Sequence, residues 1–299
     1  MHKQNRNLLF VFLGLALVNV LFLLVGDSFR GVSFDEDKFV VNDTTNIFSI
    51  QIGDNELKKL DGEWIVNDTY PVDQSLKRVL FLIMQRVQVK KPVDVELTNA
   101  IEVKIAGEDP LSFTVSGNPT KTKTYFSLEG KDEVYEVEIP GYKEYVGGIF
   151  ELNADQWRDR LVMNESWRTI QVLTLDYMDP EIDDVKITFD KDFFLVEDIS
   201  PIDSNLVVNY LNQFQYFQAN EWVSKGRFPK YDSLSVKPPL ATLTIESIND
   251  EVPYILEIFP KMPGERFFLV KLYDQSMLVI DDRRMVNILL RKNDFSNED

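Results

Sequence analysis

Apolar and polar residues follow the same order twice along this chain, because residues 64–73 align without gaps on residues 194–203. Both segments end in Pro-x-Asp. At the same offset, Leu76, Leu80, Met84 and Val87 fall on Leu206, Tyr210, Phe214 and Phe217. Spacings of four, four and three put such residues on one face of a helix. The pattern therefore predicts a strand, a turn and an amphipathic helix in each half of the chain.

Both predicted helices begin with the same signal. Asp73 and Asp203 each follow a proline by two residues. A carboxylate at this position can accept hydrogen bonds from the free N–H groups of the first helical turn. We expect the first helix over about residues 74–87 and the second over about residues 204–222.

Period-two alternation predicts strands around each helix. In the first half these are residues 47–52, 101–105, 124–128 and 133–139, and in the second half residues 170–175, 241–245, 266–272 and 276–280. One-sided alternation is typical of antiparallel sheets with one covered face. We predict an α+β fold in which an N-terminal transmembrane helix precedes two tandem repeats, each a mainly antiparallel sheet with one main helix.

The transmembrane prediction rests on residues 8–25, an apolar run with no charge and one polar residue, Asn19. A bilayer core needs roughly 20 apolar residues. Lys3 and Arg6 precede the run, so the N-terminus is expected in the cytoplasm and the bulk outside. A cleaved signal peptide is the alternative. The predicted organisation is an anchor (1–26), a linker (27–44), two repeats (45–165 and 166–292) and a polar tail (293–299).

Composition excludes several classes of function. The chain has 299 residues and a net charge of −17, which repels nucleic-acid phosphates. It has no cysteine, and its single histidine is His2 in the N-terminal tail, so thiol and Ser-His-Asp catalysis and zinc or redox-metal sites are not expected. We therefore predict no enzyme, no catalytic, cofactor-binding or metal residues, and no cofactor. A hydrolase using two carboxylates is the remaining enzymatic alternative.

Three groups of residues allow more than one interpretation. Asp179, Glu181, Asp183 and Asp184 can be calcium ligands or a solvated loop. Trp64, Trp157 and Trp167 can form a sugar-stacking platform or pack in a core. Arg158 and Arg160, beside Asp159, can bind an anion through their forked donors or form a local ion pair.

Several short motifs carry a resemblance to a known family. They are residues 60–66, the helix start at 70–73, the segments 125–128 and 134–137, and Trp157-Arg158-Asp159-Arg160. With these, the chain resembles a bacterial family known only as domain of unknown function 4340, over roughly residues 45–291 in two copies. The second copy departs from the pattern, with Phe194 in place of Trp64 and only Asp281-Asp282-Arg283-Arg284 for the last motif.

The resemblance implies a membrane-anchored extracytoplasmic protein that occurs alongside ABC-type transport components of the gliding-associated kind. We expect a non-enzymatic subunit of an envelope complex in the bacterial inner membrane, with a cytoplasmic N-terminus and a periplasmic bulk. Its expected partners are integral membrane proteins, among them ABC-type transporter subunits, and not nucleic acid. The alternative is a membrane-tethered glycan- or peptide-binding module with an aromatic pocket between the two repeats.

Overall fold

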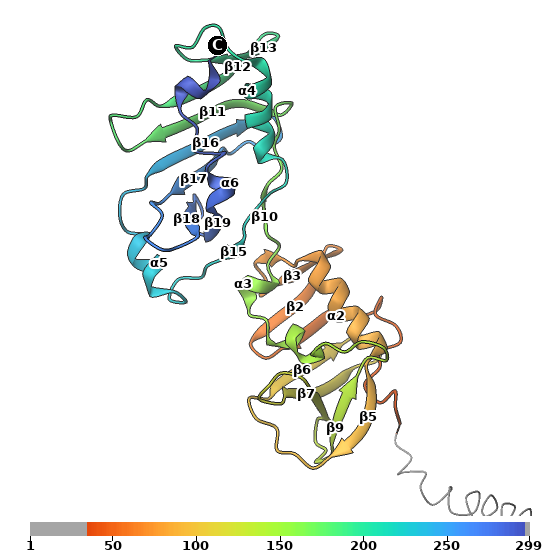
Figure 1. The fold of residues 1–299 in the computed structure, drawn as a ribbon. Coiled ribbons are helices and arrows are strands. Elements are labelled where there is room, and N and C mark those ends of the chain that lie inside the picture. The colour runs from red at the N-terminus through yellow and green to blue at the C-terminus, as the bar shows by residue number, and fades with distance from the viewer. Residues whose placement is uncertain (1–34, 297–299) are drawn as a thin grey trace, which may run out of the picture. The chain divides into compact units, whose positions relative to one another are not determined.

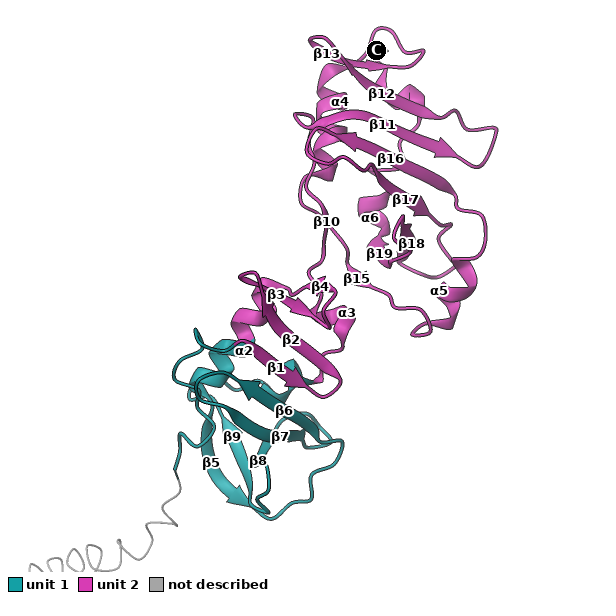
Figure 2. Cartoon of the chain, turned by 180° about the vertical axis from the view of Figure 1, so that it is seen from behind, with its two compact units in different colours: residues 1–47, 80–150 teal, residues 48–79, 151–299 magenta. Residues whose placement is uncertain are grey.

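The computed structural model describes residues 35–296, which belong to two compact units. Unit 1 comprises residues 1–47 and 80–150, and unit 2 comprises residues 48–79 and 151–299, coloured teal and magenta in Figure 2. The predicted anchor at residues 8–25 lies outside the described residues. Within residues 35–296, no helix is long and apolar enough to cross a membrane. The predicted domain boundaries stay a prediction.

Unit 1 contains an antiparallel sheet in the strand order β6-β7-β8-β9-β5 (Figure 1). The strands are β5 (Gln88–Val93), β6 (Ile101–Ala106), β7 (Leu111–Gly117), β8 (Thr124–Leu128) and β9 (Val134–Glu138). Its core is aromatic: the Phe126 ring lies 5.2 Å from Phe39, 4.8 Å from Phe113 and 5.8 Å from Phe150, between ring centroids. Helix α2 (Gln74–Arg86) and the 3-10 helix η2 (Val146–Glu151) include residues of both units.

Unit 2 contains an eight-stranded antiparallel sheet in the order β13-β12-β11-β16-β17-β18-β19-β15. These strands are β11 (Ile170–Tyr177), β12 (Val185–Asp190), β13 (Phe193–Val196), β15 (Glu221–Trp222), β16 (Ala241–Ser247), β17 (Tyr254–Ile258), β18 (Phe267–Leu272) and β19 (Met277–Asp281). Helix α4 (Ser204–Leu211) packs on the sheet through Val207, Tyr210 and Leu211, which join the core with strand residues such as Leu243. A second, smaller core that includes Leu269, Met277 and Val279 packs against Tyr231 and Leu234 of helix α5 (Pro229–Leu234), so β18 and β19 are buried on both faces of the sheet.

The other elements of unit 2 are short. A run of antiparallel hairpins links β1 (Ser49–Ile52), β2 (Asn55–Leu60), β3 (Glu63–Val66) and β4 (Tyr70–Pro71) in chain order. Strands β10 (Leu161–Met163) and β14 (Phe217–Gln218) form a separate pair. The remaining helices are α3 (Ala154–Trp157), η3 (Asn212–Phe214), α5 (Pro229–Leu234), α6 (Asp282–Met285) and η4 (Lys292–Phe295).

The described chain has a β-rich fold in which one arrangement recurs. In unit 1 the strands lie in the order β6-β7-β8-β9-β5, so the strand that comes first in the chain pairs with the strand that comes last. The strands of unit 2 lie in the corresponding order, β16-β17-β18-β19-β15. The order β3-β2-β1 likewise matches β13-β12-β11. The two helix starts are alike as well: Asp73 Oδ1 accepts backbone N–H groups at 2.8 and 3.1 Å, and Asp203 Oδ1 does so at 2.8 and 3.1 Å.

Each helix start is also held by a segment from much later in the chain. The Asp73 amide donates to the carbonyl of Trp157 at 2.8 Å, and the Asp203 amide donates to the carbonyl of Phe295 at 3.0 Å. Isolated bridges join Val72 to Arg158 and Ile202 to Ser296. The counterpart of the Trp157 motif is therefore the segment ending in Phe295, so the match to residues 281–284 is wrong. Phe295, placed by the sequence pattern in a polar tail, is fully buried.

The predicted fold class is wrong. The chain is mainly antiparallel sheet, with about 37% strand, 18% helix and few helices, so an α+β description with a transmembrane helix does not apply to the described residues. The second predicted helix, expected over residues 204–222, is shorter than predicted. Its apolar residues occur at helical spacing, but α4 ends at Leu211, because β14 pairs with β10 and β15 pairs with β19. Tertiary strand pairing overrides a local helical pattern here.

Replacing the Asp203 helix cap with alanine is expected to lower the free energy of unfolding by about 1 kcal/mol. The physical reason is that the Asn205 and Leu206 amides lose their acceptor. Urea unfolding of the purified chain measures the change. The matched control is Glu181→Ala, which removes the same charge from an exposed loop and should change the value by no more than about 0.5 kcal/mol. Equal effects of the two substitutions would contradict the capping role.

Candidate functional site

The candidate site is built around Arg158, the residue that ends helix α3. Asn153 and Gln156 form a capping box that starts this one-turn helix. The Arg158 amide donates to the carbonyl of Ala154 at 3.0 Å, and the backbone then becomes extended and forms its bridge with Val72. This short helix thus fixes the position and direction of the arginine.

The Arg158 guanidinium lies between two aromatic rings. Its central carbon is 3.7 Å from the ring centroid of Tyr70 and 3.3 Å from that of Trp222. Trp222 is itself 2% exposed and donates its indole N–H to the carbonyl of Asp159 at 2.8 Å. Cation–π stacking on both faces leaves only the N–H edge of the guanidinium for hydrogen bonds. One N–H of that edge donates to the Ser276 hydroxyl at 3.4 Å.

A pocket of about 790 Å³ opens beside this stack. Its lining includes both rings, Arg158, three lysines and four acidic residues, as follows: Tyr70, Asp155, Arg158, Trp222, Lys225, Asp232, Lys237, Glu257, Lys271 and Asp274. All of these residues belong to unit 2. Ligand pockets in proteins commonly have volumes of about 300–1,000 Å³. The space is therefore sufficient for a side chain, a peptide segment or a small molecule.

Two of the pocket's acidic side chains hold the segment that follows Trp222. The Asp155 carboxylate accepts from the Ser224 amide at 3.0 Å and from the Ser224 hydroxyl at 2.7 Å, and lies 3.4 Å from a nitrogen of Arg227. The Asp232 carboxylate accepts from the Gly226 amide at 3.1 and 3.0 Å. Both carboxylates therefore have structural roles.

The other two acidic side chains of the pocket have partners as well. Glu257 forms an ion pair with Lys271 at 2.6 Å. Asp274 accepts from the amide of Ser276 at 2.9 Å and from its hydroxyl at 3.0 Å. Asp274 thereby orients the hydroxyl that meets Arg158.

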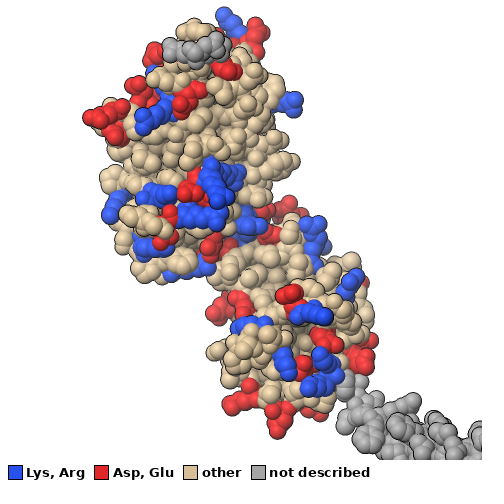
Figure 3. Space-filling view, in the orientation of Figure 1, with Lys and Arg blue, Asp and Glu red and all other residues tan. Residues whose placement is uncertain are grey.

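Three of the pocket's basic side chains have no carboxylate close enough for an ion pair within the described chain. Among residues 35–296, Arg158, Lys225 and Lys237 form no ion pair within 4.0 Å. Burial lowers the pKa of Arg158, but a guanidinium remains protonated in proteins. Four basic and four acidic residues line the pocket, so its charge is balanced overall, but these three cations lie more than 4.0 Å from every carboxylate of residues 35–296. On the face drawn in Figure 3, Lys and Arg gather around α5 and α6 with Asp and Glu among them, as in the ion pairs Lys230–Glu265 and Lys261–Asp282.

This geometry favours a carboxylate as the ligand. A guanidinium presents its N–H groups in one plane, which matches the two oxygens of a carboxylate. Of the two interpretations of Arg158, the structure favours anion binding over a local ion pair. Asp159 instead accepts from the Leu161 amide at 3.0 Å, and Arg160 lies 3.8 Å from Asp73.

The tryptophans considered for a sugar platform are placed differently. Trp64 and Trp157 are 5% and 0% exposed, and the half-buried Trp167 packs against the core of unit 2. Their positions favour the packing interpretation. Trp222 contributes to the pocket instead, and the sequence pattern missed it because it fell at the end of a predicted helix. Lys225 and Lys237 carried no local signal at all.

The calcium candidates are not brought together. Asp179 Oδ1 accepts from the Glu181 amide at 3.0 Å, and Asp184 Oδ1 accepts from the Tyr177 amide at 2.7 Å. In the part of the chain that the structure describes, no group of three or more His, Cys, Asp or Glu residues is placed to hold a metal ion. These carboxylates order turns between strands.

No family model, curated protein or solved structure matches this chain. The resemblance to domain of unknown function 4340 therefore stays a prediction.

Proposed function

We propose that this protein is a non-enzymatic, membrane-attached extracytoplasmic subunit of an envelope complex. We further propose that its Arg158 pocket binds a carboxylate group of a partner protein. The observation that carries the proposal is the stacked Arg158, whose hydrogen-bonding edge faces a pocket in which the described residues provide no carboxylate within 4.0 Å. Stacking fixes the guanidinium before any ligand arrives, so little conformational entropy is lost on binding.

The pocket's acidic residues support binding rather than hydrolysis. A carboxylate pair that cleaves a glycosidic bond needs one acid free to donate a proton and another facing the same bond. Asp155 and Asp232 hold backbone amides, Glu257 holds a lysine, and Asp274 holds Ser276. Each carboxylate has a structural partner, which is the arrangement expected of a rigid binding site.

Membrane attachment is proposed from the sequence. Residues 8–25 are apolar and follow Lys3 and Arg6, which favours a cytoplasmic N-terminus in the bacterial inner membrane and a periplasmic bulk. Partnership with integral membrane proteins of an ABC-type or gliding-motility-like system is proposed from the family resemblance alone.

A glycan- or peptide-binding module is the second candidate, because the same pocket accepts a carboxylate from either source. The aromatic rings favour the protein partner. The faces of Tyr70 and Trp222 stack on Arg158, so they do not offer the free platform on which a sugar ring would pack.

The proposal predicts that the full-length protein, extracted in mild detergent, co-purifies with integral membrane proteins. Arg158→Leu should reduce this recovery at least about tenfold, because a charge-assisted hydrogen bond contributes about 1.5–3 kcal/mol. The matched control is Arg168→Leu, at an exposed arginine outside the pocket. Recovery that is equally high for both variants, or absent for the wild-type chain in every mild detergent, would contradict the proposed function.

A further inference from the structure

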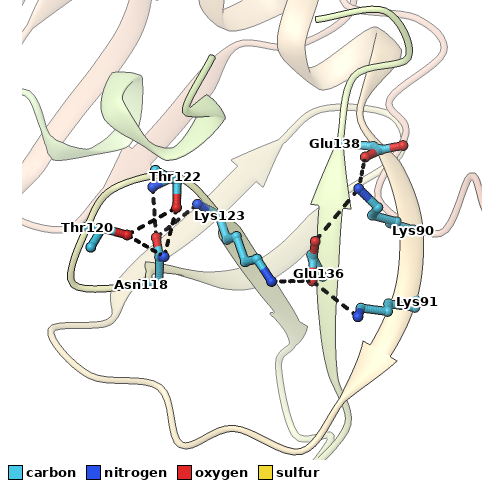
Figure 4. Close-up of polar contacts among 8 residues, drawn as sticks. All are labelled: Lys90, Lys91, Asn118, Thr120, Thr122, Lys123, Glu136 and Glu138. Carbon is cyan, nitrogen blue, oxygen red and sulfur yellow. Dashed lines mark hydrogen bonds and ion pairs between the residues drawn. The ribbon is translucent and has the colours of Figure 1, made fainter. Parts of the chain in front are cut away.

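Unit 1 carries a cluster of three lysines around one glutamate (Figure 4). The ammonium nitrogens of Lys90, Lys91 and Lys123 lie 3.8, 3.8 and 3.6 Å from the carboxylate oxygens of Glu136. The Glu136 side chain is only 9% exposed, whereas the three lysine side chains are 48%, 56% and 49% exposed. A nearly buried carboxylate thus gathers three ammonium groups that remain open to solvent.

A β-bulge brings two consecutive lysines to the same carboxylate. Side chains normally alternate between the two faces of a sheet, so neighbours in sequence point apart. In the pairing of β5 with β9, Val89 lies opposite Val137 and Lys91 lies opposite Glu136, which leaves Lys90 as the extra residue. Such a bulge redirects the side chains next to it, and here both lysines reach Glu136.

The third lysine is positioned by an ordered loop. The amides of Thr122 and Lys123 donate to Asn118 Oδ1 at 2.8 and 2.9 Å. Asn118 Nδ2 in turn donates to the hydroxyls of Thr120 and Thr122 at 2.8 and 2.9 Å. These bonds, drawn in Figure 4, fix the residues that lead into β8, and so they hold the backbone from which the Lys123 side chain extends toward Glu136.

The cluster has more positive charge than its acids balance. Lys90 also pairs with Glu138 at 2.6 Å, but within the described chain Lys91 and Lys123 have no acidic partner other than Glu136. Three ammonium groups therefore face two carboxylates, in a protein of net charge −17. A cavity of about 230 Å³ adjoins the cluster, and its charged lining consists of three lysines and three glutamates, Lys90, Lys123, Lys143, Glu136, Glu138 and Glu144. Together with Lys91, the site has four ammonium groups and three carboxylates.

We infer that this lysine cluster binds a phosphate group. Ammonium groups act as point charges with rotatable donors, so three of them around one spot suit a tetrahedral oxyanion with several equivalent oxygens. The planar fork of Arg158 suits a carboxylate, so the two sites differ in ligand class. The phosphate site does not depend on the function proposed for the pocket.

The fold indicates a lipid headgroup as the source of the phosphate, a step that rests on the proposed membrane attachment. Strand β5 is tied to the start of the described chain, because the Val89 amide donates to the Glu36 carbonyl at 2.8 Å. Gln88 also donates to Asp37 at 3.2 Å. Positions 26–35 separate this segment from the apolar run, and they can span at most about 35 Å. That length keeps the cluster within reach of the headgroups.

The first test titrates the full-length protein in detergent with inorganic phosphate and follows the acetylation rates of individual lysines by mass spectrometry. Lys90, Lys91 and Lys123 should become protected together, while the exposed Lys131 does not. Lys91→Gln and Lys123→Gln should each weaken phosphate binding about fivefold, and Lys131→Gln should leave it unchanged.

The second test separates the two sources of phosphate. The protein is placed in nanodiscs of phosphatidylcholine with or without phosphatidylglycerol, in phosphate-free buffer. Protection of the three lysines only with phosphatidylglycerol supports the lipid source. Protection by inorganic phosphate without protection by this lipid retains the site and overturns the lipid source. Unchanged lysine reactivity in both tests overturns the inference, whatever the co-purification of the Arg158 variant shows.

Discussion

Replacing Arg158 with leucine is expected to weaken carboxylate binding by roughly 10- to 100-fold, the range that a charge-assisted hydrogen bond of about 1.5–3 kcal/mol gives. Leucine removes the forked donors and leaves the Tyr70 and Trp222 rings without the cation they enclose. A hexaglutamate peptide serves as the probe. The ¹H–¹⁵N signal of the Trp222 indole reports binding, because this ring contacts the guanidinium and its N–H is fixed on Asp159.

A lysine in place of Arg158 separates charge from geometry. Arg158→Lys keeps one positive charge but loses the planar fork and most of the stacking, so it should restore only part of the affinity. Arg168→Leu should bind like the wild-type chain. Equal affinity of the leucine and wild-type proteins, with the Trp222 signal still responding to the peptide, would show that the pocket binds without Arg158 and would contradict the account.

Phe295→Ala is expected to lower the free energy of unfolding by about 3–5 kcal/mol, the largest stability effect that we predict. Phe295 is fully buried, stacks edge-on against Tyr210 with centroids 5.2 Å apart, and its carbonyl accepts from the Asp203 amide. The alanine variant leaves a cavity where the chain returns to the start of helix α4. Urea unfolding measures the effect, with an unchanged denaturant slope as the check for two-state behaviour.

The equivalent position in the other copy offers a sharper comparison. Trp157→Ala should cost about as much as Phe295→Ala, because both side chains are 0% exposed. Trp157→Phe should cost much less, since the buried Trp157 indole N–H has no hydrogen-bond partner among residues 35–296 and phenylalanine removes that unsatisfied group. A loss below about 1 kcal/mol for Phe295→Ala would show that the chain end is not part of the second core.

Local patterns in the sequence predicted the elements whose causes are local. The caps at Asp73 and Asp203 are confirmed because a carboxylate next to a helix start needs only its own first turn. The two hairpins β8–β9 and β18–β19 are confirmed because alternation and short polar turns specify them. The length of the second helix was wrong because β10 and β19 lie far away in sequence and pair with the residues that follow Leu211.

In the two sites as well, residue types follow from the local sequence, whereas the contacts between residues depend on segments far apart in the chain. Arg158 was identified from its residue type, but its role depends on Trp222 and Ser276, which no short window of sequence contains. The lysine cluster depends on a bulge, and the bulge is set by the register of β9 rather than by the lysines. The partners of the pocket's carboxylates, such as Ser224 for Asp155 and Gly226 for Asp232, depend on tertiary packing and not on a local sequence pattern.

The most direct test of the central claim, that the Arg158 pocket is where this subunit binds its partner, is site-specific photo-crosslinking in native membranes. A crosslinking amino acid replaces Lys237, which lines the pocket, in the full-length chain. We expect one dominant crosslinked product, which disappears with Arg158→Leu and persists with Arg168→Leu. A product that is unchanged by Arg158→Leu, or no stronger than that from a crosslinker at the exposed Glu181, would contradict this claim.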